Sequence, residues 1–316
     1  MGGFIAGLRD VLLVANPISG GGRAGRRVDD VAQALRELGA VPHVVRTGTA
    51  GDAMRAARDF SGGAILAFGG DGTFNEVLNG ADLEHCVLGV IPAGTGNVLA
   101  KELGLLRGPV STVRCLAEGR IARFDLGLCN GRRFISMVGA GMDADIVKAV
   151  HDCRRGKLTQ FHYVPALIRE SVCPPQWAIS VEVDGEVFLG DANAVCVGNT
   201  HSYGGPLELT PAASPTDGLL DVMAVPVRGI GDMIGPGVAS LLRALHLCRE
   251  VRYGRGVRVR LTSVREDVPW QVDGDSGGLL PAEIQVEPAR VSMLVPSSFS
   301  GAPRPVTSSP SGSPIT

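Results

Sequence analysis

The sequence predicts two domains, an α/β domain with a parallel sheet followed by a domain that is mainly antiparallel β. The length of 316 residues is more than twice the roughly 100 to 150 residues of one typical domain. Up to residue 126, short apolar runs alternate with helical patterns, which is typical of βαβ units. Beyond that point, short runs of alternating polarity joined by Asp-Gly turns indicate antiparallel hairpins.

The elements of the first domain, residues 8–126, follow from hydrophobic periodicity. Short apolar runs predict buried strands, and longer stretches with one apolar face predict the helices between them. The expected strands are 11–15, 43–46, 64–68 and 87–91. The expected helices are 26–38, 52–59, 74–79, 97–103 and 110–118.

The second domain is predicted over residues 127–296. Its expected strands are 178–183, 186–189, 194–198, 219–225, 257–262, 270–273, 282–286 and 291–295. Helical patterns interrupt them at 143–150, 161–171 and 231–247. The segment 297–316 is rich in Ser, Pro and Gly, which predicts a disordered tail.

Charge and cysteine content exclude several classes of function. Thirty basic residues against 32 acidic ones give a net charge of -2, so no electrostatic footprint for a nucleic acid is present. Seven cysteines without a Cys-x-x-Cys pair indicate neither a disulfide framework nor a zinc site, which favours a reducing cytoplasm. No window of 18 apolar residues predicts a transmembrane segment.

Three loops that follow predicted strands have the composition of phosphate-binding loops. The first, 16–22, is rich in glycine, and its backbone amides are suited to cradle a phosphate. It also fits the dinucleotide pattern Gly-x-Gly-x-x-Gly, although the strand at 43–46 ends without the acidic residue that holds a ribose. The plain alternative is a glycine turn beside the solvated arginines Arg23, Arg26 and Arg27.

The second loop, 69–76, reads Gly-Gly-Asp-Gly-Thr-Phe-Asn-Glu and places Asp71 among glycine amides. An acid there holds Mg²⁺ or accepts a proton from an attacking hydroxyl. The alternative is a tight turn in which Asp71 caps a helix. The third loop, 91–97, also joins a strand to a helix, so all three are expected along one edge of the sheet.

Asn-Pro-x-Ser-Gly at 16–20, Gly-Gly-Asp-Gly-Thr-x-Asn-Glu at 69–76 and Pro-x-Gly-Thr-Gly-Asn at 92–97 resemble the diacylglycerol kinase catalytic family. That family includes soluble bacterial lipid kinases and the sphingosine and ceramide kinases. Further motifs extend the resemblance over most of residues 11–296, among them Gly-Ala-Gly-Met-Asp-Ala at 139–144, Tyr-Gly-Gly at 203–205 and Gln-Val-Asp-Gly-Asp at 271–275. The second loop by itself is shared with NAD kinases and is related to loops of phosphofructokinase.

The resemblance implies an N-terminal domain of the NAD kinase and phosphofructokinase type and a C-terminal β-sandwich. It implies an enzyme that uses ATP and Mg²⁺ to phosphorylate diacylglycerol or a related lipid. Asp275 would be the catalytic base, and Asp71 would help to hold the phosphates. Asp217 would bind the metal with main-chain oxygens of Ser214 and Leu219. The implied nucleotide contacts are Asn16, Pro17, Ile18, Ser19, Gly20, Thr47, Gly70, Asp71, Gly72, Thr73, Phe74, Asn75, Glu76 and Thr95.

The chain departs from the family pattern at two places, with Asp275 where most members have Glu and Val98 where many have Asp. Two alternatives therefore stay open, a NAD kinase and a protein that binds nucleotide or lipid without turnover. The expected location is the cytoplasm, with peripheral attachment to the membrane surface where a lipid substrate lies. A homodimer is left open as the oligomeric state.

Overall fold

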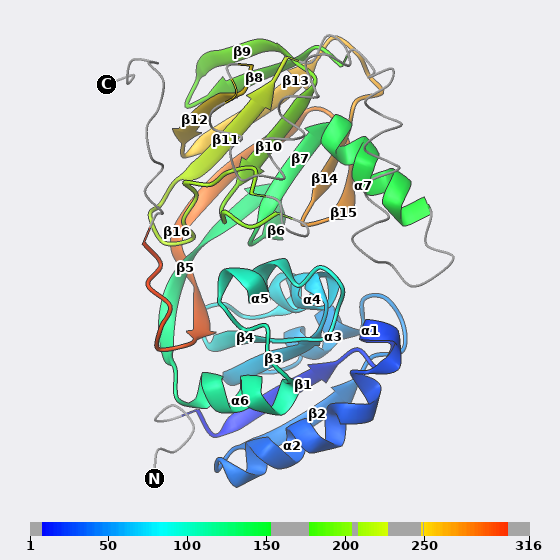
Figure 1. The fold of residues 1–316 in the computed structure, drawn as a ribbon, viewed down its shortest axis with the longest axis vertical. Coiled ribbons are helices and arrows are strands. Elements are labelled where there is room, and N and C mark those ends of the chain that lie inside the picture. The colour runs from blue at the N-terminus through cyan, green and yellow to red at the C-terminus, as the bar shows by residue number, and fades with distance from the viewer. Residues whose placement is uncertain (1–7, 153–176, 204–207, 227–247, 249, 303–316) are drawn as a thin grey trace. The chain divides into compact units, whose positions relative to one another are not determined.

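A computed structural model describes residues 8–152, 177–203, 208–226, 248 and 250–302, which group into two compact units (Figure 1). The first unit comprises Met1–Leu126, Gly131–Ile135 and Glu287–Gly301, and the second comprises the rest. The first unit therefore takes in residues from near the end of the chain, which a single boundary at residue 126 does not capture. The helices predicted at 161–171 and 231–247 lie outside the described residues.

The first unit contains all nine helices and strands predicted for residues 8–126. Its strands are β1 (Asp10–Ala15), β2 (Val41–Arg46), β3 (Gly63–Gly69) and β4 (Cys86–Pro92). They are parallel, in the order β2-β1-β3-β4. The helices are α1 (Ser19–Gly22), α2 (Val28–Glu37), α3 (Asp52–Arg58), α4 (Asp71–Gly80), α5 (Val98–Glu102) and α6 (Pro109–Ala117), with a 3-10 turn at Gly25–Arg27.

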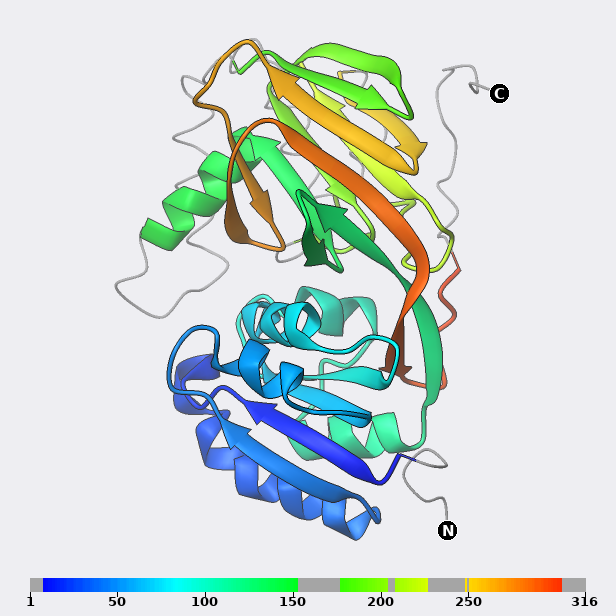
Figure 2. The same ribbon diagram turned by 180° about the vertical axis from the view of Figure 1, so that it is seen from behind.

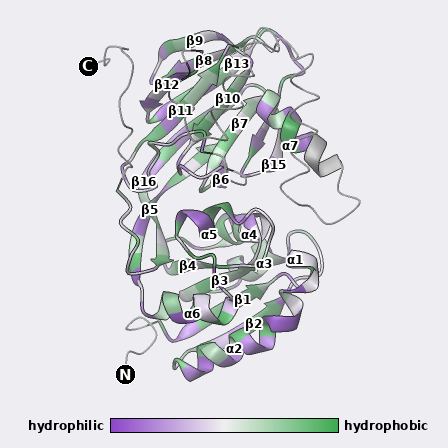
Figure 3. Ribbon diagram, in the orientation of Figure 1, coloured by the Kyte–Doolittle hydropathy of each residue, from purple (hydrophilic) through white to green (hydrophobic). Residues whose placement is uncertain are grey.

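Helices cover both faces of this sheet, which explains why its central strands are continuous apolar runs. Helices α2 and α6 pack together on one face, and α3 and α4 pack together on the other (Figures 1 and 2). Six of the seven residues of β3 are buried. Helix α2 turns only one side to the sheet, and Figure 3 shows the resulting mixture of hydrophobic and hydrophilic residues along it.

Two antiparallel sheets form the second unit, as the sequence predicts for the C-terminal domain. One has the order β12-β11-β10-β7-β14-β15, and the other contains β16-β13-β8-β9. The strands are β7 (Met137–Gly141), β8 (Ile179–Val183), β9 (Glu186–Ala192), β10 (Ala194–Gly198), β11 (Leu220–Val225), β12 (Arg252–Gly256), β13 (Arg258–Ser263), β14 (Pro269–Val272), β15 (Asp275–Leu279) and β16 (Ala282–Val295), and helix α7 is Met142–Asp152. The two-domain fold class is thus confirmed.

Five strands escape the sequence prediction, namely β5 (Arg120–Cys129), β6 (Arg132–Phe134), β7, β12 and β15. Strands β7, β12 and β15 each contain two glycines, which hide the alternation of polar and apolar residues. The strands predicted at 282–286 and 291–295 are one continuous strand, β16. The polar residues in its middle separated the two predicted strands. In the structure the strand continues through them with a kink at Ala289, where φ is 52°.

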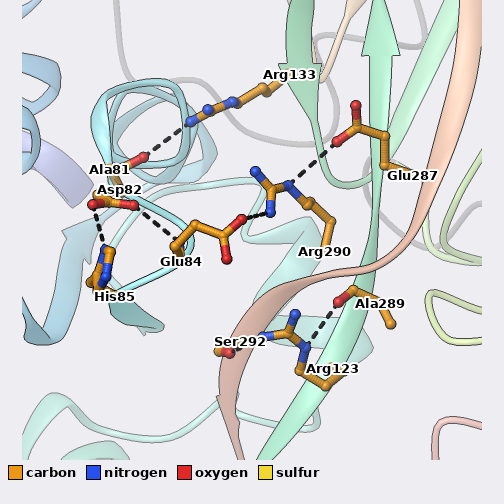
Figure 4. A network of polar contacts seen from close by, with 10 residues as sticks. All are labelled: Ala81, Asp82, Glu84, His85, Arg123, Arg133, Glu287, Ala289, Arg290 and Ser292. Carbon is orange, nitrogen blue, oxygen red and sulfur yellow. Dashed lines mark hydrogen bonds and ion pairs between the residues drawn. The ribbon is translucent and has the colours of Figure 1, made fainter.

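The kink of β16 is held by polar contacts within the first unit (Figure 4). Arg290 pairs with Glu84, which lies before β4. Arg123 on β5 donates to the Ala289 carbonyl at 2.8 Å and to the Ser292 hydroxyl at 2.7 Å. These bonds fix the point at which β16 enters the first unit, and the strand then runs parallel to β4.

The described residues extend beyond the predicted start of the tail at residue 297, up to residue 302. Phe299 packs against the fully buried Phe124 with ring centroids 5.3 Å apart. The carbonyl of Phe299 also accepts a hydrogen bond from Arg120 at 2.7 Å. A truncation that spares the fold therefore has to begin after Phe299.

Deletion of Ser300–Thr316 is expected to change the free energy of unfolding by less than about 0.5 kcal/mol, because this segment lies past the last aromatic anchor. Phe299→Ala is the matched control and is expected to lower it by about 1 kcal/mol, the scale of a lost aromatic pair. Urea unfolding of both variants makes the comparison. A deletion as damaging as the Phe299 substitution would contradict the expectation.

Candidate active site

The first loop lies at the carboxyl edge of the parallel sheet, next to the loops that follow β3 and β4. Asn16 donates from its backbone to the Phe68 carbonyl at 2.9 Å, and its side-chain amide lies 3.5 Å from the hydroxyl of Thr73. Thr47, at the end of β2, donates from its backbone to the Ala15 carbonyl at 2.9 Å. The structure therefore brings the first two loops and Thr47 together, as expected for the carboxyl ends of parallel strands.

Glycines in the first loop create a concave backbone. Gly20, Gly21 and Gly22 have φ of 62°, 68° and 83°, a left-handed conformation that other residues rarely adopt. A Cβ on Gly20 would lie 2.3 Å from the Ala93 carbonyl, so the close approach of the first and third loops requires glycine there. Successive amides in such conformations form anion-binding concavities.

Asp71 ties the second loop to the third. It is the first residue of α4, and its carboxylate accepts a hydrogen bond from the Val98 amide, the first residue of α5, at 2.7 Å. A Cβ on Gly96 would lie 2.7 Å from the other carboxylate oxygen. Burial raises the pKa of Asp71, and its backbone hydrogen bonds, chiefly from Val98, oppose that rise. Asp71 therefore caps α5, the helix after the third loop, and not α4, the helix that it begins.

The remaining residues of the second loop contribute in different ways. Gly70 precedes α4, and Gly72 is exposed on its first turn. Phe74 is buried in the core. Asn75 is also buried, and the carboxylate of Glu76 accepts a hydrogen bond from the Ala53 amide at 3.1 Å, which joins α4 to the start of α3.

The other predicted nucleotide contacts differ in their exposure. Ile18 is 80% exposed, and Thr95 in the third loop is also exposed. Pro17 accepts a backbone hydrogen bond from Gly25 at 3.1 Å, and Ser19 donates one to Asn16 at 3.1 Å. The first loop is therefore braced from inside, while Ile18 and Thr95 face solvent.

A cavity of about 420 Å³ opens beside the first and third loops. Four arginines line it, namely Arg23, Arg26, Arg27 and Arg107. Asn97 lies in its wall, and the buried side-chain oxygen of Asn97 has no hydrogen-bond partner in the described part of the chain. The sequence analysis placed the first three arginines beside the first loop, with solvated arginines as the plain alternative, and it missed Arg107, which is remote in sequence. Together they make this cavity attractive to anions.

In the second unit, Asp217, one of the expected metal ligands, belongs to an ion-pair network. Asp217 pairs with Arg255, and its other carboxylate oxygen accepts a hydrogen bond from the Leu219 amide at 3.1 Å. Arg255 also donates to the buried Asp221 at 3.1 Å. Burial raises the pKa of Asp221 to about 6, against the opposing effect of Arg255. Arg255, which the sequence reasoning missed, therefore compensates two carboxylates.

The oxygen donors near Asp217 suit Mg²⁺, which is usually held by one or two carboxylates together with water and other oxygens. Ser214, the other expected ligand before Asp217, is buried and lies three residues ahead of it in the sequence. Among the described residues, no group of three or more His, Cys, Asp or Glu side chains could hold a metal. A cation at Asp217 would therefore have one carboxylate ligand, and it would compete with Arg255 for that carboxylate.

Asp275, the expected base, is the first residue of β15 and follows a tight turn. Asp273 and Gly274 form this turn with φ of 48° and 86°, both left-handed, as in the type I′ hairpin that Asp-Gly predicts. The Asp273 carboxylate accepts hydrogen bonds from the amides of Ser136 and Met137 at 3.0 and 2.8 Å. Asp275 is half-buried and stands on a turn that is anchored to β7.

The parallel sheet with glycine loops at its carboxyl edge, joined to an antiparallel sandwich, defines the class of a nucleotide-dependent phosphotransferase. Residues 10–129 match the diacylglycerol kinase catalytic domain, and residues 136–295 match the YegS C-terminal NAD kinase beta sandwich-like domain. A diacylglycerol kinase of Bacillus subtilis is 32% identical over 282 residues, which cover 86% of this chain and 91% of that protein. The chain belongs to the diacylglycerol kinase family and is a lipid kinase.

A second relative agrees with this assignment, and a solved structure shares the fold. A diacylglycerol kinase of Staphylococcus saprophyticus is 30% identical over 290 residues, which cover 85% of this chain and 90% of that protein. The crystal structure of a diacylglycerol kinase from Bacillus anthracis has a TM-score of 0.74 at 22% identity and covers 93% of this chain and all (100%) of that chain. At this level of identity the structural likeness concerns the fold. No described helix has the length and apolar character needed to cross a membrane.

Proposed function

We propose that the protein transfers the γ-phosphoryl group of ATP to the hydroxyl of diacylglycerol or a closely related lipid, with Mg²⁺ as the metal. The observation that carries this proposal is that three loops lie at one sheet edge, where the bond from Val98 to Asp71 ties the second loop to the third. The relatives named diacylglycerol kinase, matched over most of both chains, support the choice of lipid. Because such a lipid resides in a bilayer, the enzyme would act at a membrane surface.

In this proposal the first unit binds the nucleotide. The left-handed glycines of the first loop present amides to the phosphates, and the nearby arginines add positive potential. Asp71 fixes the relative position of the second and third loops through the Val98 amide. Phosphoryl transfer depends mainly on such positioning and on neutralising charge, with little covalent work for the protein.

Asp217 would hold Mg²⁺ with main-chain oxygens of Ser214 and Leu219, and the metal would supply charge neutralisation when bound. Asp275 would accept the proton of the attacking lipid hydroxyl. Its place directly after a turn anchored at Ser136 and Met137 supports this role, because a general base must be held within hydrogen-bond reach of its proton.

A phosphate-transfer assay tests the proposal. Radiolabelled ATP and Mg²⁺ are offered with mixed micelles containing diacylglycerol, ceramide, sphingosine or monoacylglycerol, and separately with NAD. Labelled phosphatidic acid as the main product is the expected result. Labelled NADP would establish the NAD kinase alternative, and ATP binding without transfer to any acceptor would establish a binding protein.

Asp217→Asn is expected to raise the Mg²⁺ concentration for half-maximal activity by about tenfold, because a neutral amide is a weaker ligand for a hard cation than a carboxylate. Titration of activity with Mg²⁺ at saturating ATP measures the shift. Asp191→Asn, at an exposed carboxylate on β9 of the same unit, is the control and should leave the titration unchanged. An unshifted curve for Asp217→Asn would place the metal elsewhere.

A further inference from the structure

Three residues without a role in the proposed chemistry, each from a different sequence motif, meet inside the second unit. Asp143 comes from Gly-Ala-Gly-Met-Asp-Ala, Tyr203 from Tyr-Gly-Gly and Gln271 from Gln-Val-Asp-Gly-Asp. Tyr203 donates its hydroxyl to one carboxylate oxygen of Asp143, and Gln271 donates its side-chain amide to the other at 2.9 Å. All three residues are buried, with exposed fractions of 8%, 7% and 2% for Asp143, Tyr203 and Gln271.

The far end of this network is the turn that carries Asp275. The side-chain oxygen of Gln271 accepts a hydrogen bond from the Gly274 amide at 2.8 Å. A backbone N–H can only donate, so the oxygen of Gln271 must face Gly274 and its NH₂ group must face Asp143. The carboxylate of Asp143 accepts from that NH₂ group and thereby holds the amide in the one orientation that bonds the turn.

The backbone leaves room for this chain of hydrogen bonds only because residue 139 is glycine. Gly139 on β7 pairs with Gln271 on β14. A Cβ there would lie 1.5 Å from the Asp143 carboxylate and 2.7 Å from the Gln271 amide nitrogen. The glycine of the 139–144 motif thus admits the bond between Asp143 and Gln271.

Two independent attachments then hold the turn before Asp275. Asp273 accepts from the amides of Ser136 and Met137, at the start of β7, and Gly274 donates to Gln271. Another Asp-Gly turn of this unit, Asp184-Gly185, has a similar carboxylate attachment, since Asp184 accepts from the amides of Val257 and Arg258 at 3.0 and 2.8 Å. The turn before Asp275 has a second attachment besides the carboxylate one, namely the bond from Gly274 to the buried Gln271.

We propose that Asp143, Tyr203 and Gln271 are positioning residues for Asp275, and that the buried carboxylate of Asp143 sets the geometry of the turn by orienting Gln271. This inference rests on the proposed role of Asp275 as the base. It predicts that the polarity of the network matters, because each hydrogen bond needs one donor and one acceptor in a fixed order. A change of volume alone does not explain such a dependence.

Gln271→Glu is the critical variant, since it keeps the size and the acceptor for Gly274 but places a second carboxylate oxygen against Asp143. Two buried acceptors then face each other, and the turn is displaced. The expected result is a fall in kcat of about 30-fold or more with little change in the KM for ATP, which binds through the loops of the first unit. Hydrogen exchange of the Gly274 amide should accelerate in parallel.

The double variant Asp143→Asn with Gln271→Glu restores the order of donors and acceptors. The amide introduced at position 143 donates to the carboxylate introduced at position 271, that carboxylate accepts from Gly274, and the total charge equals that of the original pair. Its kcat and its Gly274 exchange rate should return to within about threefold of the unmodified protein.

Asp143→Asn alone leaves a side-chain oxygen that can still face Gln271, so the kcat of this single variant should also fall by no more than about threefold. Asp184→Asn is the control in the Asp184-Gly185 turn and should keep full turnover.

Normal kcat in Gln271→Glu would overturn the inference, and so would a loss that Asp143→Asn does not repair. The melting temperature of each variant identifies any that fail to fold, and the double variant supplies the decisive comparison if Gln271→Glu is unstable. If the unmodified protein phosphorylates no lipid, the proposed function fails. The exchange of the Gly274 amide would still decide whether Asp143 controls the turn.

Discussion

Asp275→Asn is expected to lower kcat by about 10³-fold while the affinity for ATP barely changes. The amide keeps the shape and the hydrogen-bonding capacity of the acid but cannot accept the proton of the lipid hydroxyl, and a positioned general base contributes about 10² to 10⁴ in rate. Steady-state assays with diacylglycerol micelles and a separate measurement of ATP binding report the two quantities. The change should therefore separate chemistry from nucleotide binding.

Asp275→Glu provides the matched comparison, because it restores the longer acid that most of the family uses. It should keep activity or raise it, unless the anchored turn of Asp273 and Gly274 already brings the shorter acid to the right place. Retention of lipid kinase activity by Asp275→Asn would move the search for the base to another acid, with Asp71 first.

Asp71→Ala is expected to reduce phosphoryl transfer by at least about 10²-fold, the usual effect of removing a positioned charged group. It also removes the acceptor of the Val98 amide, so a loss of about 1 kcal/mol in the free energy of unfolding should accompany it, as for other helix caps. Turnover and urea unfolding are measured on the same preparation.

Asp71→Asn separates the two effects, because its side-chain oxygen still caps α5 while the charge is gone. If it turns over normally, the charge of Asp71 has no part in the mechanism and the residue serves only to join the two loops. If it is as slow as Asp71→Ala at near-normal stability, the charge itself is required.

The sequence predicted the first unit more fully than the second, for a physical reason. Buried parallel strands such as β3 are continuous apolar runs, and α2 has a clear apolar face, so local periodicity reveals both. Strands β7 and β15 contain glycines where other groups approach closely. A Cβ on Gly277, for example, would lie 2.1 Å from the ring of Trp270. The group that approaches each glycine comes from another segment of the chain, so the local sequence pattern does not predict the strand.

The same distinction applies to the candidate site. The glycine loops and Asp71 could be found because each motif lies on a contiguous stretch. Arg255, Arg107 and the bond between Asp143 and Gln271 could not, since each depends on residues that the fold brings together from far along the chain. Sequence reasoning therefore found the loops and the acids but missed the groups that compensate and orient them.

The last described strand, β16, adds to the sheet of the first unit. Ser292 and Met293 on β16 pair with Val87 and Leu88 on β4, and the apolar residues at this end of β16, Val291, Met293, Leu294 and Val295, are fully buried. During synthesis on the ribosome, β4 therefore emerges long before the strand that covers its edge. Until then that hydrophobic edge is open to pairing with other chains, a recognised route to aggregation. A fragment ending at residue 126 would keep this exposed edge permanently, so expression of the first unit alone requires residues 287–301 supplied as a fused or added strand.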